Sequence, residues 1–440
     1  MWDICGKRTD NLEEIKEYFG MKFLPMTRSL IDTDLYKFSM GQVYHNWFPE
    51  LFTEWDFKAR NVGLELDHED YTKEDVEEII KQVKAYCALR YEEAELAYFR
   101  ANTIWIKLGY LDYLLDWRPR FEDFDIKFHK GKLKITFKGL QRRISYYEIP
   151  ILEICAEVYY RNHYDYDKLL REAKEETEKK IKKMCELDAD GNPKYHFGIW
   201  SEFGARRRLS FEFQDWLVGR LAYEYKNNPI FAKAGTFLGT SNVHLANKYN
   251  ITAVGTCAHE FIMCVGQGDP MYNPAFSNKL AMDAWTREYG TLNGIWLTDT
   301  VGDALCRRDM KLTYSKLFDG VRNDSGDPFE WADNWIEHYK SYKIDPKTKT
   351  LLFSNSISSI ELWDKLCRYV EGRAKPAFGV GTYWSGPQTI KPLNIVAKVA
   401  IVNGRHVAKK SDDPGKGMCR SEEYVGWLTG TCDMRLAAGY

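Results

Sequence analysis

The chain has 440 residues, of which 44% are hydrophobic, and its 62 basic and 64 acidic side chains leave a formal net charge of -2. This near-neutral balance argues against a nucleic-acid-binding protein, which needs an excess of basic charge to meet the phosphates. No stretch approaches the roughly 20 apolar residues of a membrane-spanning helix, and the first residues lack the apolar run of a signal peptide. We therefore expect a cytoplasmic, globular protein that has neither a nucleic-acid partner nor a membrane segment.

The ten cysteines are scattered along the chain, and no two of them form a C-x-x-C pair. The sequence therefore indicates neither a zinc ribbon nor a thioredoxin-type redox centre. We expect reduced, mostly buried thiols.

The first part of the chain mixes helical and strand patterns. Hydrophobic residues at helical spacing in residues 71–99 predict a helix that starts at Thr72. Apolar and polar residues alternate around a glycine in residues 125–138, as in a hairpin. These patterns predict an α+β layer domain over residues 1–160.

From about residue 165 a long charged helix is followed by short apolar runs that alternate with helical patterns. The candidate strands are residues 251–257, 294–298, 351–354 and 377–380. The candidate helices between them are residues 242–248, 278–289, 330–339 and 358–370. This alternation predicts parallel strands in residues 161–390, either closed as a barrel or left as an open sheet.

The last part of the chain contains a second hairpin pattern. Residues 391–409 read as two strands joined at Asn403-Gly404, a common hairpin turn. We expect residues 391–440 to return to the N-terminal layer.

Polar residues follow the candidate parallel strands at the point where each strand ends. They are His259, Asp299, Asn355 and the pair Gly381-Thr382. Ligands bind at the carboxyl ends of parallel strands, so this pattern predicts one site built from all four loops.

Two segments are suited to phosphate groups. In GVRNDSGDP, Arg322 offers a planar fork for phosphate or pyrophosphate, and Asp324 and Asp327 can hold sugar hydroxyls or Mg²⁺. In FGVGT, Gly379 and Gly381 can form a nest of backbone donors. A polar turn and a tight strand-to-helix turn explain these two compositions equally well.

Two further positions suggest an aromatic acid and a nucleophile. Phe203 and Arg206, three residues apart, can present a ring and a cation to a flat carboxylic acid, although a solvated helix start is the plain alternative. His259 is not part of a zinc H-E-x-x-H motif, because Met263 occupies the second histidine position. A histidine after a strand can instead accept a phosphoryl group. No G-x-x-x-x-G-K-[ST] motif occurs, so any ATP must use a site built for another phosphate ligand.

Taken in order, nine segments resemble the nicotinate phosphoribosyltransferase family. They are IDTDLYKFSM (31–40), FGARRRLS (203–210), GTSNVHLA (239–246), GTCAHEF (255–261), LTDT (297–300), GVRNDSGDP (320–328), FSN (353–355), FGVGT (378–382) and KPLNIVAK (391–398). The resemblance implies a type II phosphoribosyltransferase fold, in which an irregular α/β barrel packs on an N-terminal α+β sandwich domain completed by C-terminal strands.

The resemblance also implies the reaction. Nicotinate and phosphoribosyl pyrophosphate would give nicotinate mononucleotide and pyrophosphate in NAD salvage, coupled to ATP hydrolysis through a phosphohistidine. It implies Mg²⁺ as a cofactor, ATP as a co-substrate and a homodimer with shared active sites.

Site residues carry over by motif. His259 matches the phosphorylated histidine, and Arg322 and Asp324 match residues that hold the phosphoribosyl donor. The nicotinate ring would lie between Phe203 and a Tyr36 from the neighbouring subunit, near Arg206. The implied phosphate and donor contacts are Thr240, Asn355, Gly379, Gly381 and Thr382.

Three alternatives remain open. In a nicotinamide-specific enzyme an Asp stands where this chain has Ser241; a carboxylate there would repel nicotinate, so Ser241 favours the acid. A catalytically silent barrel that binds a nucleotide would not need His259 and Arg206 together. A barrel hydrolase using paired carboxylates from Asp299, Asp303 or Asp324 leaves both Arg206 and Arg322 unexplained.

Overall fold

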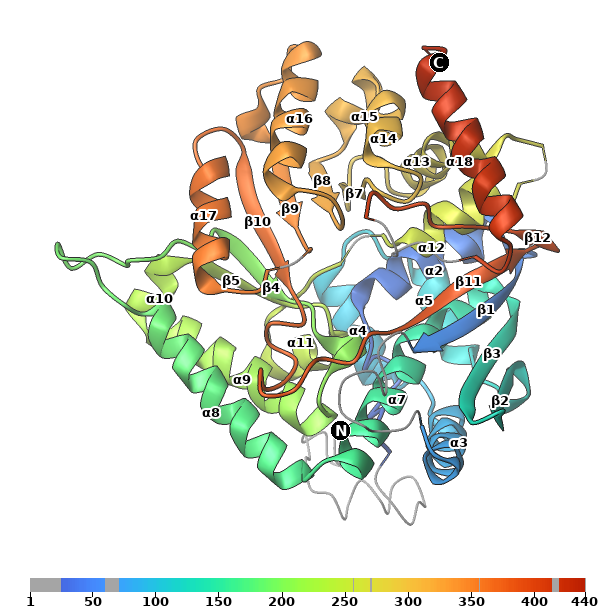
Figure 1. Ribbon diagram of the computed structural model, residues 1–440, viewed down its shortest axis with the longest axis horizontal. Coiled ribbons are helices and arrows are strands. Elements are labelled where there is room, and N and C mark those ends of the chain that lie inside the picture. Colours follow the sequence, from blue (N-terminus) through green and yellow to red (C-terminus); the bar gives the residue numbers. More distant parts are fainter. Residues whose placement is uncertain are drawn as a thin grey trace.

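The computed structural model describes residues 25–59, 71–255, 257–269, 271–355, 357–413 and 419–439. Two β-sheets organise this part of the chain (Figure 1). The antiparallel sheet has the strand order β12-β11-β1-β3-β2, with β1 (Phe52–Ala59), β2 (Phe124–His129), β3 (Lys132–Leu140), β11 (Ile395–Val402) and β12 (Arg405–His406). The predicted return of the C-terminal hairpin to the N-terminal layer is confirmed, because β11 pairs with β1.

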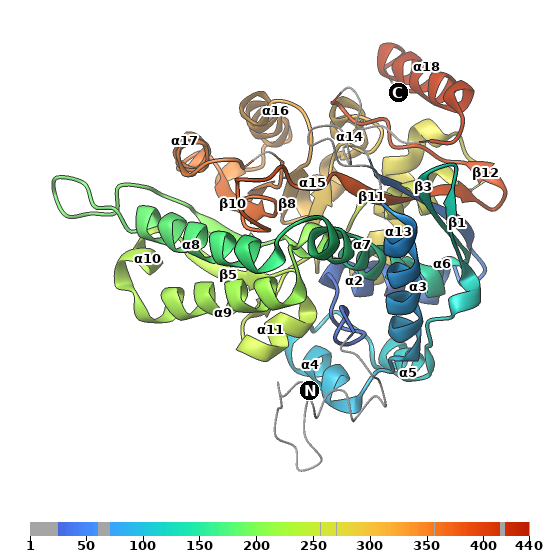
Figure 2. The same ribbon diagram turned by 60° about the horizontal axis from the view of Figure 1, so that its bottom comes forward.

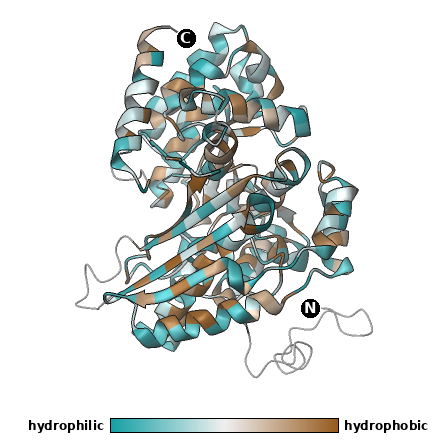
Figure 3. Ribbon diagram, turned by 90° about the vertical axis from the view of Figure 1, so that its right-hand side faces the viewer, coloured by the Kyte–Doolittle hydropathy of each residue, from teal (hydrophilic) through white to brown (hydrophobic). Residues whose placement is uncertain are grey.

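The antiparallel sheet is buried on one face, as its sequence pattern requires. Buried and exposed residues alternate along β3, and Figure 3 shows hydrophobic and hydrophilic residues alternating on these strands. The predicted hairpin of residues 125–138 is confirmed as β2 and β3, and the turn at Lys130-Gly131 has a positive φ at both residues.

Six helices belong to this part of the chain: α2 (Leu35–Trp47), α3 (Lys73–Ala88), α4 (Glu93–Asn102), α5 (Leu108–Asp116), α6 (Gln141–Ile144) and α7 (Glu148–His163). Of these, α3, α6 and α7 pack directly on the strands of the antiparallel sheet. The single helix predicted over residues 71–99 is wrong in length, because the structure has two helices there. Thr72 does begin α3, through a capping box with Asp75. Helix α3 ends at Ala88, because the next residue, Leu89, is buried in an extended conformation. A second capping box between Glu92 and Glu95 starts α4.

The second sheet is parallel, with the order β6-β5-β4-β10-β9-β8-β7. Its strands are β4 (Ile199–Glu202), β5 (Thr236–Thr240), β6 (Thr252–Ala253), β7 (Ile295–Leu297), β8 (Gly320–Asn323), β9 (Thr350–Phe353) and β10 (Lys375–Val380). Within the described residues the edge strands β6 and β7 do not pair, so the predicted irregular barrel is an open half-barrel. The prediction of a parallel α/β sheet packed on an N-terminal α+β layer is thereby confirmed.

Helices cover the outside of the half-barrel (Figures 1 and 2). They are α8 (Tyr166–Met184), α9 (Phe211–Asn227), α10 (Pro229–Ala234), α11 (Val243–Tyr249), α13 (Ser277–Tyr289), α14 (Asp303–Asp309), α15 (Leu312–Leu317), α16 (Pro328–Ser341) and α17 (Ile360–Val370). The four predicted strands and the helices between them are all present, although β6 is much shorter than the predicted residues 251–257. Periodicity missed β4, β5 and β8, although they are no shorter than the predicted strands β7 and β9.

One hydrophobic core runs through both sheets, from Trp55 in β1 to Trp363 in α17. The division into residues 1–160, 161–390 and 391–440 therefore stays a prediction, and its first limit falls inside α7. The last helix, α18 (Glu422–Ala437), packs over a small separate cluster that includes Leu305 of α14.

The nine cysteines of the described residues are free, and Cys5 lies outside them. No helix in the described ranges is both long and apolar enough to cross a membrane.

The close approach of β5 and β6 requires a glycine at position 239, and this requirement can be tested. The φ of Gly239 is +152°, and an added Cβ would lie 2.0 Å from the carbonyl oxygen of Thr252 in β6. We expect Gly239→Ala to lower the free energy of unfolding by about 2 kcal/mol or more, measured by urea denaturation.

Gly109→Ala is the matched control, because a Cβ at this position in α5 meets nothing within 4 Å. It should leave stability unchanged or raise it slightly, since Ala favours a helix over Gly. Equal effects of the two substitutions would contradict the close approach of β5 and β6.

Candidate active site

A cavity of about 560 Å³ opens at the carboxyl ends of the parallel strands. It brings together nine of the residues that the sequence selected: Phe203, Arg206, His259, Arg322, Asp324, Asn355, Gly379, Gly381 and Thr382. Tyr36, Thr240, Ser241 and Asp327 are not among the residues that line it. Most of these lining residues end a parallel strand or follow one, so the parallel sheet itself makes the site.

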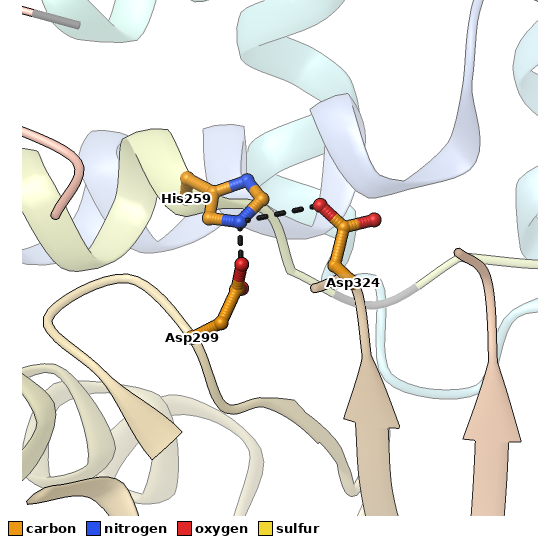
Figure 4. A group of neighbouring side chains, drawn as sticks. All are labelled: His259, Asp299 and Asp324. Carbon is orange, nitrogen blue, oxygen red and sulfur yellow. Dashed lines mark hydrogen bonds and ion pairs between the residues drawn. The ribbon is translucent and has the colours of Figure 1, made fainter. Parts of the chain in front are cut away.

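His259 lies between two carboxylates (Figure 4). It begins the short helix α12 (His259–Phe261), and its Nε2 is 2.8 Å from Asp299 Oδ1 and 3.4 Å from Asp324 Oδ2. Since a carboxylate only accepts hydrogen bonds, Nε2 of a neutral imidazole must carry the proton here. Nδ1 then keeps the lone pair and is the nucleophilic nitrogen.

The charges around His259 favour a neutral imidazole between ionised carboxylates. Burial, helped by Lys409, lowers the pKa of His259 to about 4 against the opposing effect of Asp299 and Asp324. Burial disfavours ionisation of Asp324, but Arg322, His259 and Lys409 outweigh it and lower its pKa to about 2. A neutral imidazole is the form that can act as a nucleophile.

Lys409 is a functional residue that sequence reasoning missed. Its Nζ lies 2.9 Å from Asp299 Oδ2 and 3.5 Å from Asp324 Oδ2, and its side chain is 3% exposed. The residue follows β12 and enters the cavity from the antiparallel sheet. Lys409 ends the predicted hairpin and Lys410 follows it, and nothing in their spacing tells which of the two faces the site.

Arg322 and Asp324 form the adjoining part of the cavity. Arg322 Nε donates to Ser354 Oγ at 2.7 Å, and its Nη2 is 3.4 Å from Asp324 Oδ1. Asp327 acts differently, because its carboxylate caps α16 by accepting from the backbone N–H groups of Phe329 and Glu330. Its contacts do not support the metal or sugar role suggested for it.

Phe203 and Gly379 fit together at the other end of the cavity. A Cβ on Gly379 would lie 2.4 Å from the Phe203 ring, so only glycine lets the ring pack against β10. The backbone N–H of Phe203 donates to Val380 O at 2.9 Å. Gly379 therefore determines the position of the Phe203 ring. Its predicted role in phosphate binding is a separate one.

The guanidinium of Arg206 is accessible to a ligand and is paired only at long range within the chain. Its side chain is 44% exposed, and the nearest carboxylate oxygen, Glu148 Oε1, is 3.9 Å from its Nη1. Lys37, which is fully buried, pairs more closely with Glu148, at 2.5 Å, and also with Glu260. Burial raises the pKa of Glu260, and Glu148 adds to this against the effect of Lys37, so the negative charge of Glu260 at this end of the cavity is weakened.

Tyr36 lies behind this end of the cavity, in its own chain. The hydroxyl of Tyr36 is 3.5 Å from Glu148 Oε2, and the side chain is 8% exposed. A ring sandwich between Tyr36 and Phe203, with Tyr36 supplied by a neighbouring subunit, is not visible within a single chain.

Ser241 and Thr240 lie outside the cavity lining and form hydrogen bonds with buried carboxyl groups. Ser241 Oγ donates to Asp34 Oδ1 at 2.5 Å, so a carboxyl group does lie beside the position that the charge argument treated as uncharged. Burial raises the pKa of Asp34, which weakens its repulsion of a carboxylate. Thr240 Oγ1 donates to Glu202 Oε2 at 2.6 Å, and Glu202 also accepts from the backbone N–H of Gly204.

The cluster around His259 is also suited to a cation. Ligand atoms of His259, Asp299 and Asp324 all lie within 4.8 Å of one another. Two carboxylates offer the oxygen ligands that Mg²⁺ prefers.

Comparison with known proteins identifies the family of the chain. The sequence pattern of the nicotinate phosphoribosyltransferase (NAPRTase) family matches residues 199–432, and that of the N-terminal domain of the family matches residues 31–156. The nicotinate phosphoribosyltransferase of Acinetobacter baylyi is 37% identical over 407 residues, which cover 92% of this chain and 96% of that protein. The enzyme of Neisseria gonorrhoeae is 37% identical over 402 residues, covering 91% and 96%.

Solved structures show the same fold. The crystal structure of nicotinate phosphoribosyltransferase from Porphyromonas gingivalis has a TM-score of 0.80 and 29% identity, covering 92% of this chain and 99% of that one. A putative nicotinate phosphoribosyltransferase from Saccharomyces cerevisiae gives a TM-score of 0.81 at 29% identity, covering 93% and 99%. The chain belongs to the nicotinate phosphoribosyltransferase family.

Proposed function

We propose that the cavity joins nicotinate to the ribose of phosphoribosyl pyrophosphate and releases nicotinate mononucleotide and pyrophosphate. The observation that carries this proposal is the convergence of Arg206, His259 and Arg322 on one cavity. An aromatic acid, a phosphorylated sugar and a phosphoryl acceptor each need one of these side chains. Family membership and full-length relatives of the same name support the same reaction.

Nicotinate binds at the Phe203 end. The ring stacks on Phe203, and the carboxylate meets the Arg206 guanidinium, which can form a charge-assisted pair of hydrogen bonds with it. Lys37 adds positive charge behind Glu148. The partly exposed guanidinium of Arg206 is the cation that can meet the carboxylate, and it favours nicotinate over nicotinamide more directly than Ser241 does.

Phosphoribosyl pyrophosphate binds at the Arg322 end. Arg322 holds the pyrophosphate, Asp324 lies near the ribose, and the backbone at Gly381 and Thr382 receives the 5′-phosphate together with Asn355. The pyridine nitrogen donates its lone pair to ribose C1 while the bond from C1 to the pyrophosphate oxygen breaks. The electron pair leaves with pyrophosphate, so the chain needs to position the partners and stabilise charge rather than move a proton.

His259 takes the γ-phosphoryl group of ATP on Nδ1: the Nδ1 lone pair forms the bond to the γ-phosphorus while the bond to the β–γ bridging oxygen breaks, and ADP leaves with that electron pair. The Nε2–H bond to Asp299 orients the ring, and Lys409 offsets the repulsion between Asp299 and an incoming phosphate. Asp299 and Asp324 would hold Mg²⁺, which when bound neutralises part of the phosphate charge. Asp327 is left out of this ligand set because it caps α16.

The alternatives are weaker. A hydrolase that uses Asp299 and Asp324 as its paired carboxylates needs one of them protonated, but burial is outweighed at both: Arg322, His259 and Lys409 lower the pKa of Asp324 to about 2, and His259 and Lys409 lower that of Asp299. Asp303 accepts from Trp335 Nε1 at 2.8 Å and lies outside the cavity lining. A catalytically silent barrel that only binds a nucleotide would not need Lys409 and His259 on the same carboxylate, Asp299. A dimer with shared sites and a cytoplasmic location stay predictions.

Arg206→Ala should raise the KM for nicotinate by about 10- to 100-fold, because a charge-assisted hydrogen-bond pair is lost. The free energy of unfolding should change by less than about 1 kcal/mol, since the side chain is partly exposed and only loosely paired. Steady-state kinetics and urea denaturation measure the two effects. Arg206→Lys keeps the positive charge without the planar pair of donors, so its KM for nicotinate should rise less than that of Arg206→Ala. If Arg206→Ala lowers stability as much as activity, the proposed role of Arg206 is contradicted.

His259→Ala should abolish the stimulation of product formation by ATP while leaving some uncoupled transfer. Incubation with γ-labelled ATP should place an acid-labile phosphate on the wild-type chain and none on the variant. His129→Ala is the control, because His129 is an exposed residue at the end of β2. Undiminished ATP stimulation in His259→Ala would refute the proposed phosphoryl acceptor.

His259 should stay neutral at acidic pH. Its pKa of about 4, against 6.5 ordinarily, keeps it unprotonated at pH 5.5, where about 90% of free imidazoles are protonated. The unfolded chain binds this proton more readily, so the contribution of His259 to stability falls as the pH drops from 6.5 towards 4. Nitrogen-15 NMR of the histidine-labelled chain without Mg²⁺ measures this titration; a midpoint near 6.5 contradicts the description of the site.

A further inference from the structure

Residues 407–413, which we term the C-terminal strap, lie against the loops that follow β7 and β8. The backbone N–H of Lys410 donates to Thr300 O at 2.8 Å. The backbone N–H of Asp303 donates to Asp412 Oδ2 at 3.0 Å, and that of Gly326 donates to Asp413 Oδ1 at 3.0 Å. The strap thus contacts the two loops that carry Asp299 and Asp324.

Gln267 holds the strap at one point with both ends of its amide. Its Nε2 donates to Ala408 O at 2.7 Å, and its Oε1 accepts from the Ala408 N–H at 2.8 Å. The Tyr424 hydroxyl of α18 donates to the same Oε1 at 3.3 Å. The Gln267 side chain is 2% exposed, so water does not compete for these bonds.

The position of Gln267 in the chain connects it with His259. Gln267 is the last residue of η4 (Ile262–Gln267), which continues directly from the helix that begins at His259. Ala408 immediately precedes Lys409. The amide therefore fixes the backbone next to Lys409 relative to the helical segment that carries His259.

We propose that Gln267 is a positioning residue for the reaction, which acts by setting Lys409 between Asp299 and Asp324. Gln267 does not line the cavity and so acts without touching substrate. A shift of Lys409 removes the lysine charge from Asp299 and leaves Asp324 with Arg322 alone, so the two carboxylates beside His259 repel an incoming phosphate more strongly. This inference rests on the proposed phosphoryl transfer to His259.

Gln267→Met in the full chain is the main test, because Met has a similar length and makes neither backbone bond. We expect the rate of acid-labile phosphate incorporation from γ-labelled ATP to fall about tenfold, as small displacements at reacting groups do. The KM for nicotinate should stay within about twofold, since Arg206 and Phe203 are untouched. Gln267→Glu keeps the acceptor for the Ala408 N–H, so its phosphorylation rate should fall less than that of Gln267→Met.

Gln82→Met is the matched control for the loss of a buried amide. Gln82 Oε1 accepts from the backbone N–H of Met26 at 3.0 Å, away from the cavity. This variant should keep the wild-type phosphorylation rate even where its melting temperature falls. A phosphorylation rate in Gln267→Met equal to that of Gln82→Met overturns the proposal.

A double variant separates positioning from plain stability. In a Lys409→Met background, Gln267→Met should cause no further loss of phosphorylation, because its effect passes through Lys409. Losses that multiply would show that Gln267 acts independently of Lys409 and would overturn the proposal. Failure of the wild-type chain to form nicotinate mononucleotide would instead refute the proposed function.

Discussion

The hydrogen bond between Asp299 and the Nε2 of His259 determines which nitrogen of the imidazole can react. Asp299 is buried and shares its second oxygen with Lys409 at 2.9 Å and with the Ser325 hydroxyl at 2.6 Å. It is therefore held from three sides and cannot turn away from the histidine. The tautomer, the direction of Nδ1 and the charge that an approaching phosphate meets all follow from this one carboxylate.

Charge is divided along the cavity to match two different ligands. At the Phe203 end, Arg206 presents a partly exposed cation, Lys37 lies buried against Glu148 and Glu260, and Gly379 of β10 lets the Phe203 ring pack against the strand. At the other end, acidic and basic groups alternate around His259 so that phosphate, pyrophosphate and a divalent cation all find partners. The parallel sheet makes this division possible, because its strand ends deliver side chains from distant parts of the sequence to one edge.

Much of this arrangement is predictable from the sequence. The βα alternation predicts the parallel sheet, and the polar residues after each strand identify His259, Asp299 and Asn355, because strand ends meet at one edge whatever the order of strands. Local spacing could not reveal Lys409 or the ion pair of Lys37 with Glu148, which join segments far apart in the chain. It also assigned Asp327 to chemistry when its carboxylate caps a helix, since both uses favour the same residue.

The most direct test of the account is a crystal structure of the chain with nicotinate mononucleotide bound. We predict that the pyridine ring stacks on Phe203, with its carboxylate within hydrogen-bond distance of the Arg206 guanidinium and its phosphate against the backbone of Gly381 and Thr382. A product molecule bound away from this cavity, or with its carboxylate turned towards His259 and Asp324, would contradict the division of charge on which the proposed reaction depends.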